Sequence, residues 1–501
     1  MMNIKRAKQE IKDAVEAYLF KDEDGEYLLP ILRQRPLLLL GAPGIGKTQI
    51  MEQVARECSI ALVSYTITHH TRQSAIGLPF IAKKCYGGRE YSVTEYTMSE
   101  IVASIYDKME ETGLQEGILF LDEINCVSET LSPAMLQFLQ YKTFGNHAIP
   151  KGWVIVAAGN PPEYNKSVRE FDVVTLDRLK KIEVEPDYPA WKEYASREGI
   201  HPAVLSYLNL RTSNFYKMET TVDGRQFVTP RGWEDLSRIL KIYEKLGKKA
   251  DEELIIQYLQ HGQVAKDFAA YLELYENYES DYQVEKILSG EPFEGMLRKL
   301  AHAGFDERLS VVGLLLSGLN GSFQECYEDD EEQKLLFGIL RNFKERLASG
   351  TSSGICFTEA MEVFEEETQR KRKADLLTRT EEKRYQRAGR KLRSFGEKLR
   401  KSGLWDSKEG FQVIKEAFDL QQDESGERFE RAAARLESAF DFMEAAFQNS
   451  QEMVAFLSEL NSSFYSVWFL KEYPCERYYT YNQNLLLEEK TREIMRRIRE
   501  L

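Results

Sequence analysis

Short apolar runs alternate with amphipathic stretches along residues 1–185. Apolar runs of this length, bounded by turn residues, predict strands that are buried on both faces. The predicted strands are Leu37–Leu40, Ala61–Tyr65, Gly117–Leu121, Trp153–Ala158 and Ile182–Val184. Amphipathic stretches predict helices at Ile4–Leu19, Gln49–Ala55, Met98–Met109 and Pro133–Gln140. Strands and helices in alternation indicate an α/β fold with a parallel sheet.

Two further segments predict β-hairpins within this α/β region. Phe80–Tyr86 and Arg89–Val93 are β-like runs that flank the turn Gly87-Gly88. The segment Lys142–Ile149 has Gly145-Asn146 at its centre. Turns of two such residues between β-like runs are typical of hairpins.

The strand at Leu37–Leu40 leads into a glycine-rich loop and then into a helix. The loop has the spacing Gly-x-x-x-x-Gly-Lys-Thr, and its candidate nucleotide-binding residues are Gly41, Ala42, Pro43, Gly44, Ile45, Gly46, Lys47, Thr48 and Gln49. Glycines let such a loop wrap an anion, and the helix that follows directs its positive end at the same point. Lys47 is placed to reach the β- and γ-phosphates, and the Thr48 hydroxyl to bind Mg²⁺. A chance match has a frequency on the order of a few per cent, so we predict a nucleoside triphosphate site.

Polar residues also end two later strands. Asp122 and Glu123 follow Gly117–Leu121, and Asn160 follows Trp153–Ala158 and Gly159. In a phosphate-transferring enzyme the first carboxylate holds Mg²⁺ and the second activates the attacking water. The alternative is a buried strand whose end happens to be acidic. Because ligands bind at the carboxyl ends of parallel strands, we expect these side chains to converge with Thr48 on one site.

The pattern changes at Pro186-Asp187-Tyr188-Pro189, which predicts a domain boundary. We expect an α/β core with its N-terminal helix at 1–185, a smaller helical domain at 186–281 and a helical C-terminal extension at 282–501. Thr229-Pro230 predicts a helix start, with threonine as N-cap and proline as first residue. In the extension, Phe440, Met443 and Phe447 share one helical face, for which core packing is the favoured use.

Charge and composition narrow the function classes. The 501 residues carry a net charge of −14, which disfavours general attraction to nucleic acid. A basic segment at 370–401 follows an acidic run at Glu328–Glu332; a solvated helix or a partner surface is favoured there over nucleic-acid binding. No apolar stretch is long enough to span a membrane, so membrane insertion is not expected. The first residues predict a charged amphipathic helix and not a signal peptide, so secretion is not expected.

Cysteine and histidine positions give little sign of a structural metal. The six cysteines (Cys58, Cys85, Cys126, Cys326, Cys356 and Cys475) have no C-x-x-C spacing, which favours a reduced cytoplasmic protein. His69-His70 invites a metal interpretation. Adjacent residues of a strand point to opposite faces, however, and no third ligand is spaced nearby, so we do not favour it.

Taken in order, these motifs resemble those of the AAA+ ATPases, and within them the MoxR-type group. The match comprises Walker A (Gly41–Thr48), Walker B (Leu119–Glu123), sensor 1 (Asn160), an arginine finger in Leu176-Asp177-Arg178-Leu179 and sensor 2 in Thr229-Pro230-Arg231. The two hairpins are typical of the clade with a helix-2 insert and a pre-sensor 1 hairpin. The resemblance implies a P-loop αβα sandwich of strand order 5-1-4-3-2, followed by a helical lid. About 70 residues separate the loop from Asp122, too many for one βα step, which agrees with that order.

The resemblance also implies roles for the site residues. Glu123 is the expected general base, Asp122 with Thr48 the Mg²⁺ anchor, and Asn160 a residue that positions the water. Arg178 is expected to act on the γ-phosphate of a neighbouring subunit, although a surface ion pair is the plain alternative and Arg169 a second candidate. Arg231 is expected to contact the nucleotide from the lid, and whether it does so in cis or in trans stays open.

Three functions follow from these expectations. The favoured one is an ATP- and Mg²⁺-dependent remodelling factor that forms a ring, a hexamer by resemblance, and acts on a protein partner, possibly a von Willebrand factor A domain protein. The second is a nucleic-acid motor. The acidic charge disfavours it, and so do the hairpin tips Gly87-Gly88 and Gly145-Asn146, which lack aromatic residues and are flanked by only a few basic ones. The third is a nucleotide switch without turnover, against which the intact pair Asp122-Glu123 argues.

Overall fold

The computed structural model describes the chain except residues 70–71, 145, 165–167, 169–170, 222–223, 349 and 484–501. The chain divides into two compact units. The first comprises Met1–Ala190 and Glu366–Glu382, and the second comprises Trp191–Glu365 and Lys383–Leu501.

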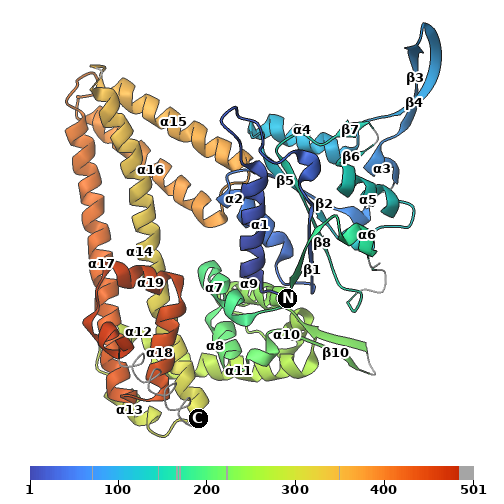
Figure 1. Cartoon of the computed structure of the whole chain (residues 1–501). Coiled ribbons are helices and arrows are strands. Elements are labelled where there is room, and N and C mark those ends of the chain that lie inside the picture. Colours follow the sequence, from blue (N-terminus) through green and yellow to red (C-terminus); the bar gives the residue numbers. More distant parts are fainter. Residues whose placement is uncertain are drawn as a thin grey trace, which may run out of the picture. The chain divides into compact units, whose positions relative to one another are not determined.

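A five-stranded parallel sheet forms the centre of the first unit (Figure 1). Its strand order is β2-β5-β8-β1-β9. When these five strands are numbered 1 to 5 along the chain and read from β9, the order is 5-1-4-3-2, which confirms the prediction. The strands are β1 (Leu37–Gly41), β2 (Ala61–Thr66), β5 (Gly117–Asp122), β8 (Trp153–Gly159) and β9 (Lys180–Val184). β1 therefore lies between β8 and β9, with Leu40 opposite Gly159 on one side and Glu183 on the other.

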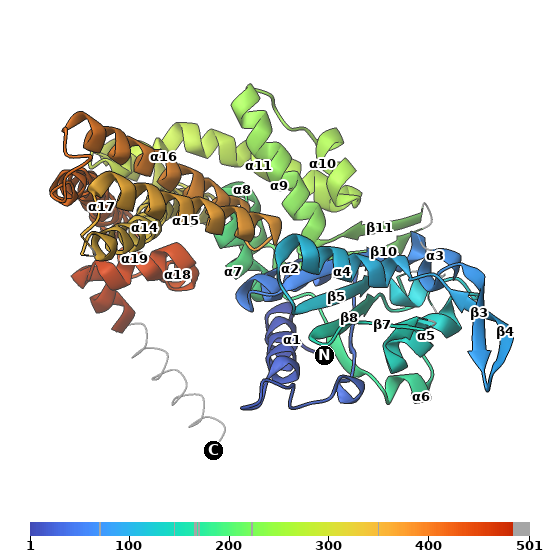
Figure 2. The ribbon, with the colours of Figure 1, turned by 90° about the horizontal axis from the view of Figure 1, so that it is seen from above.

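Helices cover both faces of this sheet, as Figures 1 and 2 show. The main ones are α1 (Ile4–Leu19), α2 (Lys47–Glu57), α4 (Glu100–Thr112) and α5 (Ser132–Tyr141), and the short ones are α3 (Arg72–Ile76) and α6 (Val173–Leu176). Polar caps set where they begin: Asn3 Oδ1 accepts from the N–H of Arg6 at 2.9 Å, and Ser99 caps α4.

The core of the first unit lies between the sheet and these helices. Leu38, Leu119, Phe138, Trp153 and Ile155 belong to one cluster of buried side chains. Strands covered on both faces need continuous apolar runs, which is why the pattern Leu37–Leu40 predicted a buried strand correctly. The sequence predicted α1 with its observed bounds as well.

Both predicted hairpins are present in the first unit. The long one pairs β3 (Pro79–Tyr86) with β4 (Arg89–Tyr96), and most of its residues are exposed. The short one pairs β6 (Thr143–Phe144) with β7 (His147–Ala148). Its Phe144 is buried, and the ring stacks on Phe138 of α5 with centroids 3.9 Å apart. The short hairpin is thus anchored to the core, whereas the long one projects from it.

The second unit is mainly helical. Its helices are α7 (Tyr188–Glu198, which begins in the first unit), α8 (Pro202–Leu210), α9 (Pro230–Leu246), α10 (Glu252–Leu259), α11 (Gly262–Tyr282), α12 (Val284–Leu288), α13 (Glu294–Leu300), α14 (Phe305–Leu347), α15 (Ser353–Lys373, which ends in the first unit), α16 (Arg379–Lys401, which begins in the first unit), α17 (Phe411–Phe447), α18 (Gln451–Ser462) and α19 (Phe464–Glu472). As predicted, Thr229 caps α9, its hydroxyl accepting from the N–H of Gly232 at 3.3 Å, and Pro230 is the first helical residue.

One segment within the stretch 186–281, which was predicted to be helical, is not a helix. An antiparallel hairpin pairs β10 (Lys217–Thr221) with β11 (Gly224–Val228). The β-branched pair Thr220-Thr221 favours an extended backbone, and Gly224 has a φ of +125°, which other residues rarely adopt. Val228 ends the hairpin as a fully buried side chain.

Buried aromatic side chains form much of the core of the second unit. Tyr207, Trp233 and Phe268 pack together with ring centroids 5.1–5.6 Å apart. Further along, Phe440, Met443 and Phe447 are buried, as predicted from their shared face. Long helices α14 and α17 pack against each other.

The basic segment and the acidic run of the sequence pair with each other. Arg384 of α16 donates to both carboxylate oxygens of Glu328 at 3.0 and 3.1 Å. Arg387 and Lys391 of α16 lie 2.8 and 2.7 Å from the carboxylate of Glu332, whose side chain is almost fully buried. For these three cations the solvated-helix and partner-surface interpretations are wrong, because their partners are on α14 of the same chain.

Two further features concern membrane-spanning helices and disulfides. No helix in the described ranges is long and apolar enough to cross a membrane. All six cysteines lie among described residues, and none of them forms a disulfide.

Candidate nucleotide-binding site

The glycine-rich loop joins the carboxyl end of β1 to the start of α2. Gly44 and Gly46 have φ values of +75° and +93°, which side chains disfavour. A Cβ on Gly41 would lie 2.6 Å from the main-chain oxygen of Val184 in β9. α2 begins at Lys47, with Gly46 as its N-cap, so the positive end of the helix opens at the loop. Local backbone chemistry therefore produces the anion cradle that the sequence predicted from Gly41 through Gln49.

Lys47 is buried within this cradle. Its Nζ donates to the main-chain oxygens of Gly41 and Ala42 and to Oδ1 of Asn160, each at 2.8 Å. These acceptors are neutral, so the positive charge of the ammonium is not cancelled by them. Phosphate oxygens are stronger acceptors for an ammonium than amide oxygens, and Lys47 can exchange these partners for a phosphate.

Thr48 and Asp122 meet although they lie on different elements. Thr48 Oγ1, in the first turn of α2, donates to Oδ2 of Asp122 at the end of β5, at 3.2 Å. A hydroxyl and a carboxylate are hard oxygen ligands of the kind that Mg²⁺ prefers, with water and phosphate oxygens completing its octahedron. The donor set therefore fits Mg²⁺ bound together with a nucleotide.

Glu123 follows Asp122 in a left-handed conformation. Its φ is +56°, an uncommon value for a residue with a side chain and one that occurs where structure imposes it. The N–H of Glu123 donates to Oδ1 of Asp122 at 2.9 Å. Its Oε2 accepts from Oγ1 of Thr68 at 2.9 Å. The turn thus directs the second carboxylate away from β5 and toward the residues that follow β2.

The sequence analysis missed Thr68, although one signal for it existed. β2 pairs with β5 in parallel, with Thr66 opposite Asp122. The residues just after the two strands must therefore lie side by side, and Thr68 is a hydrogen-bonding side chain two positions beyond Thr66. Strand order was predicted, but the register between strands was not.

Asn160 is held from two sides at the end of β8. Its side-chain oxygen accepts from Lys47, and its main-chain oxygen accepts from Nδ2 of Asn125 at 2.8 Å. Asn125 is buried and packs over Gly159, where a Cβ would lie 2.5 Å from Asn125 Oδ1. Asn125 was also missed by the sequence analysis; its position two residues after Glu123 was the available signal.

Five predicted site residues therefore converge at the carboxyl edge of the sheet: Lys47, Thr48, Asp122, Glu123 and Asn160. The two predicted arginines that the structure describes lie elsewhere. Arg178 is exposed, two residues after α6, and donates to Oε1 of Gln140 on α5. Arg231 belongs to the second unit, where it is exposed in the first turn of α9.

Two candidates fall wholly or partly on undescribed positions. Arg169, the second candidate for the finger, lies outside the described residues, as do His70 and the side chain of His69. Among the residues that the structure describes, no cluster of three or more histidines, cysteines or carboxylates is arranged to hold a metal ion by itself.

Comparison with known protein families finds a match, which covers the part of the chain that contains this site. Residues 37–176 match the model of the family described as ATPase family associated with various cellular activities (AAA). This stretch is an AAA ATPase domain. The AAA domain contains all five residues that converge at the sheet edge, and it ends before Arg178 and Arg231. It covers a little over a quarter of the chain, and no curated protein matches the chain.

Proposed function

We propose that this chain is a ring-forming, Mg²⁺-dependent ATPase of the MoxR type that remodels a protein partner. The observation that carries the hydrolytic part is the convergence of Lys47, Thr48, Asp122, Glu123 and Asn160 at the carboxyl edge of the sheet. A site for binding alone needs the first three residues, whereas a second carboxylate and an amide beside them suit an enzyme that activates water.

In this proposal each side chain has a defined task. Lys47 binds the β- and γ-phosphates, and Thr48 and Asp122 hold Mg²⁺, which neutralises charge on those phosphates. Glu123 accepts the proton of the attacking water. Asn160 holds that water in line with the bond that breaks, between the γ-phosphorus and the bridging oxygen. ADP and phosphate are the products.

The general base provides the test of hydrolysis. Glu123→Gln keeps the size of the side chain and removes its basicity, so turnover should fall about 10²- to 10⁴-fold while ATP binding persists. Phosphate release by the purified variant and its ATP affinity by calorimetry would measure both effects. Hydrolysis by Glu123→Gln at the wild-type rate would overturn the assignment.

Assembly is the second part of the proposal. Arg178 is exposed and lies outside the converged cluster, which suits a residue that serves the nucleotide of a neighbouring subunit. A finger in trans makes the site composite. Closed rings with identical head-to-tail contacts satisfy this requirement, and the resemblance favours six subunits.

The partner assignment rests on the resemblance and on two structural features. The β3–β4 and β6–β7 hairpins occupy the chain positions typical of the clade with a helix-2 insert and a pre-sensor 1 hairpin, to which the resemblance assigns the MoxR-type group. The proposed partner is a von Willebrand factor A domain protein. The proposed location is the cytoplasm, in keeping with six cysteines that form no disulfide. Stimulation of ATP hydrolysis by such a protein would test the partner.

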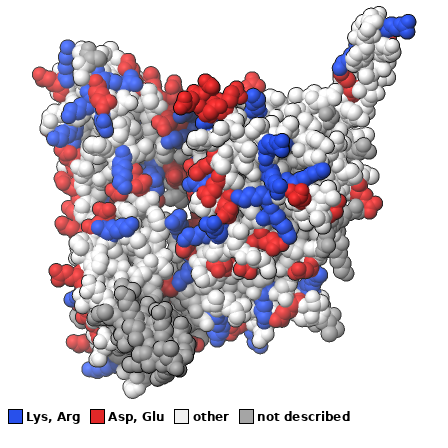
Figure 3. All heavy atoms as spheres, in the orientation of Figure 1, with Lys and Arg blue, Asp and Glu red and all other residues white. Residues whose placement is uncertain are grey.

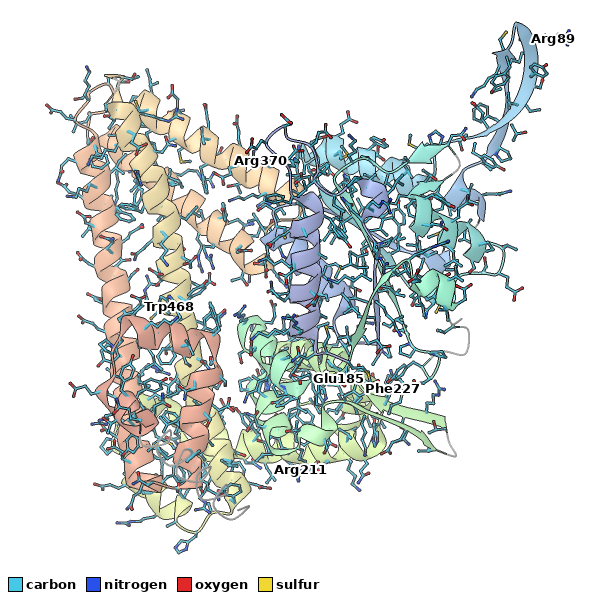
Figure 4. The ribbon with its side chains drawn as sticks, viewed as in Figure 1. Arg89, Glu185, Arg211, Phe227, Arg370 and Trp468 are labelled. Carbon is cyan, nitrogen blue, oxygen red and sulfur yellow. The ribbon has the colours of Figure 1, made fainter. Side chains whose placement is uncertain are left out.

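A nucleic-acid motor is the second candidate, and one observation favours it. The prediction that the hairpin tips lack basic and aromatic residues is wrong for β3–β4. Tyr86 and Tyr91 are exposed with ring centroids 6.1 Å apart, and Arg89 lies at the free end of the hairpin, where basic side chains mark the tip (Figures 3 and 4). Exposed aromatic rings beside cations can stack on bases. Stimulation of the ATPase by single-stranded DNA would favour the motor over the protein remodeller.

A further inference from the structure

We propose that Gln140 is a positioning residue that orients the guanidinium group of Arg178. The inference rests on the proposed role of Arg178 as a finger and adds the residue through which this chain aims it. The geometry that carries it is a hydrogen bond from Nη1 of Arg178 to the side-chain oxygen of Gln140. The two residues are 38 positions apart, so the fold, and not local sequence, brings them together.

The helix that carries Gln140 is a fixed support. Gln140 lies in the last turn of α5, directly after Phe138 and Leu139, which are both buried in the core of the first unit. The next residues, Tyr141 and Lys142, lead into the β6–β7 hairpin, which Phe144 anchors by stacking on Phe138. The amide of Gln140 is therefore presented from a helix whose position is set on both sides by packing.

The backbone of Arg178 is held as well, but its side chain is long and exposed. Leu179 is buried in the same core, and the preceding α6 is capped by Asp172, whose Oδ1 accepts from the N–H of Thr175 at 2.7 Å. These contacts fix the position of the Arg178 backbone. They do not fix the direction of its guanidinium group, which depends on other contacts. An arginine that must meet a phosphate on another molecule gains from being held in one direction beforehand.

Gln140 and Arg178 share a pocket of about 300 Å³ on the surface of the first unit. Its lining includes the leucine side chains Leu136, Leu139 and Leu179 as well as the polar residues Gln137, Gln140 and Arg178. The guanidinium of Arg178 therefore lies at a concave part of the surface.

The chemistry of an amide suits this task. A carboxylate at position 140 would pair with Arg178 and cancel much of the charge that the finger must offer to the phosphoryl group. The oxygen of glutamine accepts one hydrogen bond and leaves the positive charge intact. Arg178 has five N–H donors, so those not engaged by Gln140 remain for phosphate oxygens.

Gln140→Met tests the inference, because methionine keeps the length of the side chain and removes the acceptor. At protein concentrations at which rings form, we expect kcat for ATP to fall about 3- to 10-fold, the range for losing one ordinary hydrogen bond, because this bond is exposed to water, with KM unchanged. Gln137→Met is the matched control, since Gln137 lines the same pocket on the same helix. It should retain the wild-type kcat and KM.

A double-mutant cycle with Arg178→Ala separates positioning from a structural role. If Gln140 acts through Arg178, then Gln140→Met should change kcat little in the Arg178→Ala background. An equal fall in both backgrounds, or no fall in the single variant when Arg178→Ala does reduce kcat, would overturn the role of Gln140 alone. If Arg178→Ala itself retained the wild-type kcat, the finger assignment would fail, and the role of Gln140 with it.

Discussion

At the scale of single residues, Lys142 is a cation that the fold buries next to the proposed machinery. It ends α5 with a φ of +57°, is only 2% exposed and donates from Nζ to the main-chain oxygen of Ile31 at 2.6 Å. Burial lowers the pKa of its ammonium to about 8. Water solvates an ammonium better than a carbonyl oxygen does, so the charged form is destabilised in the folded state.

The sign of the resulting pH dependence follows from that pKa. Below pH 8 the folded and unfolded chains both carry the proton, and the full cost of burying the charge, roughly 3 kcal/mol, is present. Between pH 8 and about 10.5 the folded chain loses the proton while the unfolded chain keeps it. The contribution of Lys142 to the free energy of unfolding therefore becomes less unfavourable as pH rises through this window.

Lys142→Met tests this sign. The variant should be more stable than the wild type at pH 7, by about 1–3 kcal/mol after the loss of the bond to Ile31. Its advantage should shrink by pH 9.5. Thermal unfolding of both proteins at both pH values measures the difference, and other titrating groups cancel because they are common to the two proteins. The same advantage at pH 7 and pH 9.5 would contradict the burial argument.

Residues of the site differ in how far sequence could predict them. Lys47, Thr48, Asp122, Glu123 and Asn160 were predictable because each follows a recognisable strand or loop. Their roles stay predictions. Thr68, Asn125 and Gln140 were not found, because their importance depends on contacts with residues 35–55 positions away. Such contacts depend on strand register and helix placement, which hydrophobic periodicity does not specify.

At the scale of elements, α14 and α16 are joined by a layer of buried charge. Glu332 is almost fully buried, whereas its partners Arg387 and Lys391 are partly exposed. On either side of this layer α14 contributes apolar residues to the core, among them Phe323 and Leu336. A buried carboxylate fixes the register between two helices, because sliding either helix by one turn would leave it unpaired.

Glu332→Gln should therefore destabilise this part of the second unit. The substitution keeps the shape but removes the anion that Lys391 contacts and leaves Arg387 only its longer contact with Glu328, at 3.5 Å. We therefore expect a loss of about 2–4 kcal/mol, less than for a fully buried pair. Hydrogen exchange at the amides of α14 reports this loss locally. Glu345→Gln, which breaks an exposed pair with Arg341 on the same helix, is the control and should change exchange little. Equal effects of the two variants would argue against a stabilising layer.

The elements themselves were predicted best where pattern and packing agree. The five sheet strands are buried on both faces, so their apolar runs are unambiguous, and the two hairpins of the first unit carry clear turn signals. The β10–β11 hairpin was missed because Lys217–Val228 is short, largely polar and followed by a strong helix start at Thr229-Pro230. An exposed two-stranded hairpin needs little apolar periodicity, so the pattern that predicts core strands does not detect it.

At the scale of the whole molecule, part of the basic segment pairs with part of the acidic run. Three cations of α16 contact Glu328 and Glu332 of α14 within the second unit. The mutual attraction of the two segments was not inferred from sequence, because 55 residues separate Glu332 from Arg387 and nothing local relates them. Fold class could be predicted from the first 185 residues, whereas the arrangement of the C-terminal helices could not.

Assembly gives the sharpest prediction at this scale. If Arg178 serves the site of a neighbour, Arg178→Ala should still bind ATP and assemble, yet hydrolyse about 10³- to 10⁵-fold more slowly. Glu123→Gln is inactive for the complementary reason, because it keeps Arg178 and lacks the base. In mixed rings some interfaces join an intact Glu123 to an intact Arg178, whereas a finger acting within its own subunit would gain nothing from mixing.

Mixing the two inactive variants in equal amounts therefore tests the composite site. Random assembly makes about one interface in four competent in a ring of head-to-tail contacts, so activity should recover to roughly a quarter of the wild-type value. The control replaces Arg178→Ala by the double variant Arg178→Ala/Glu123→Gln, which has no intact base at any interface and should give no recovery. Specific activity of the wild type should also rise with protein concentration as rings form. Activity that is independent of concentration, together with no recovery on mixing, would reject a finger in trans and direct attention to Arg231 or Arg169.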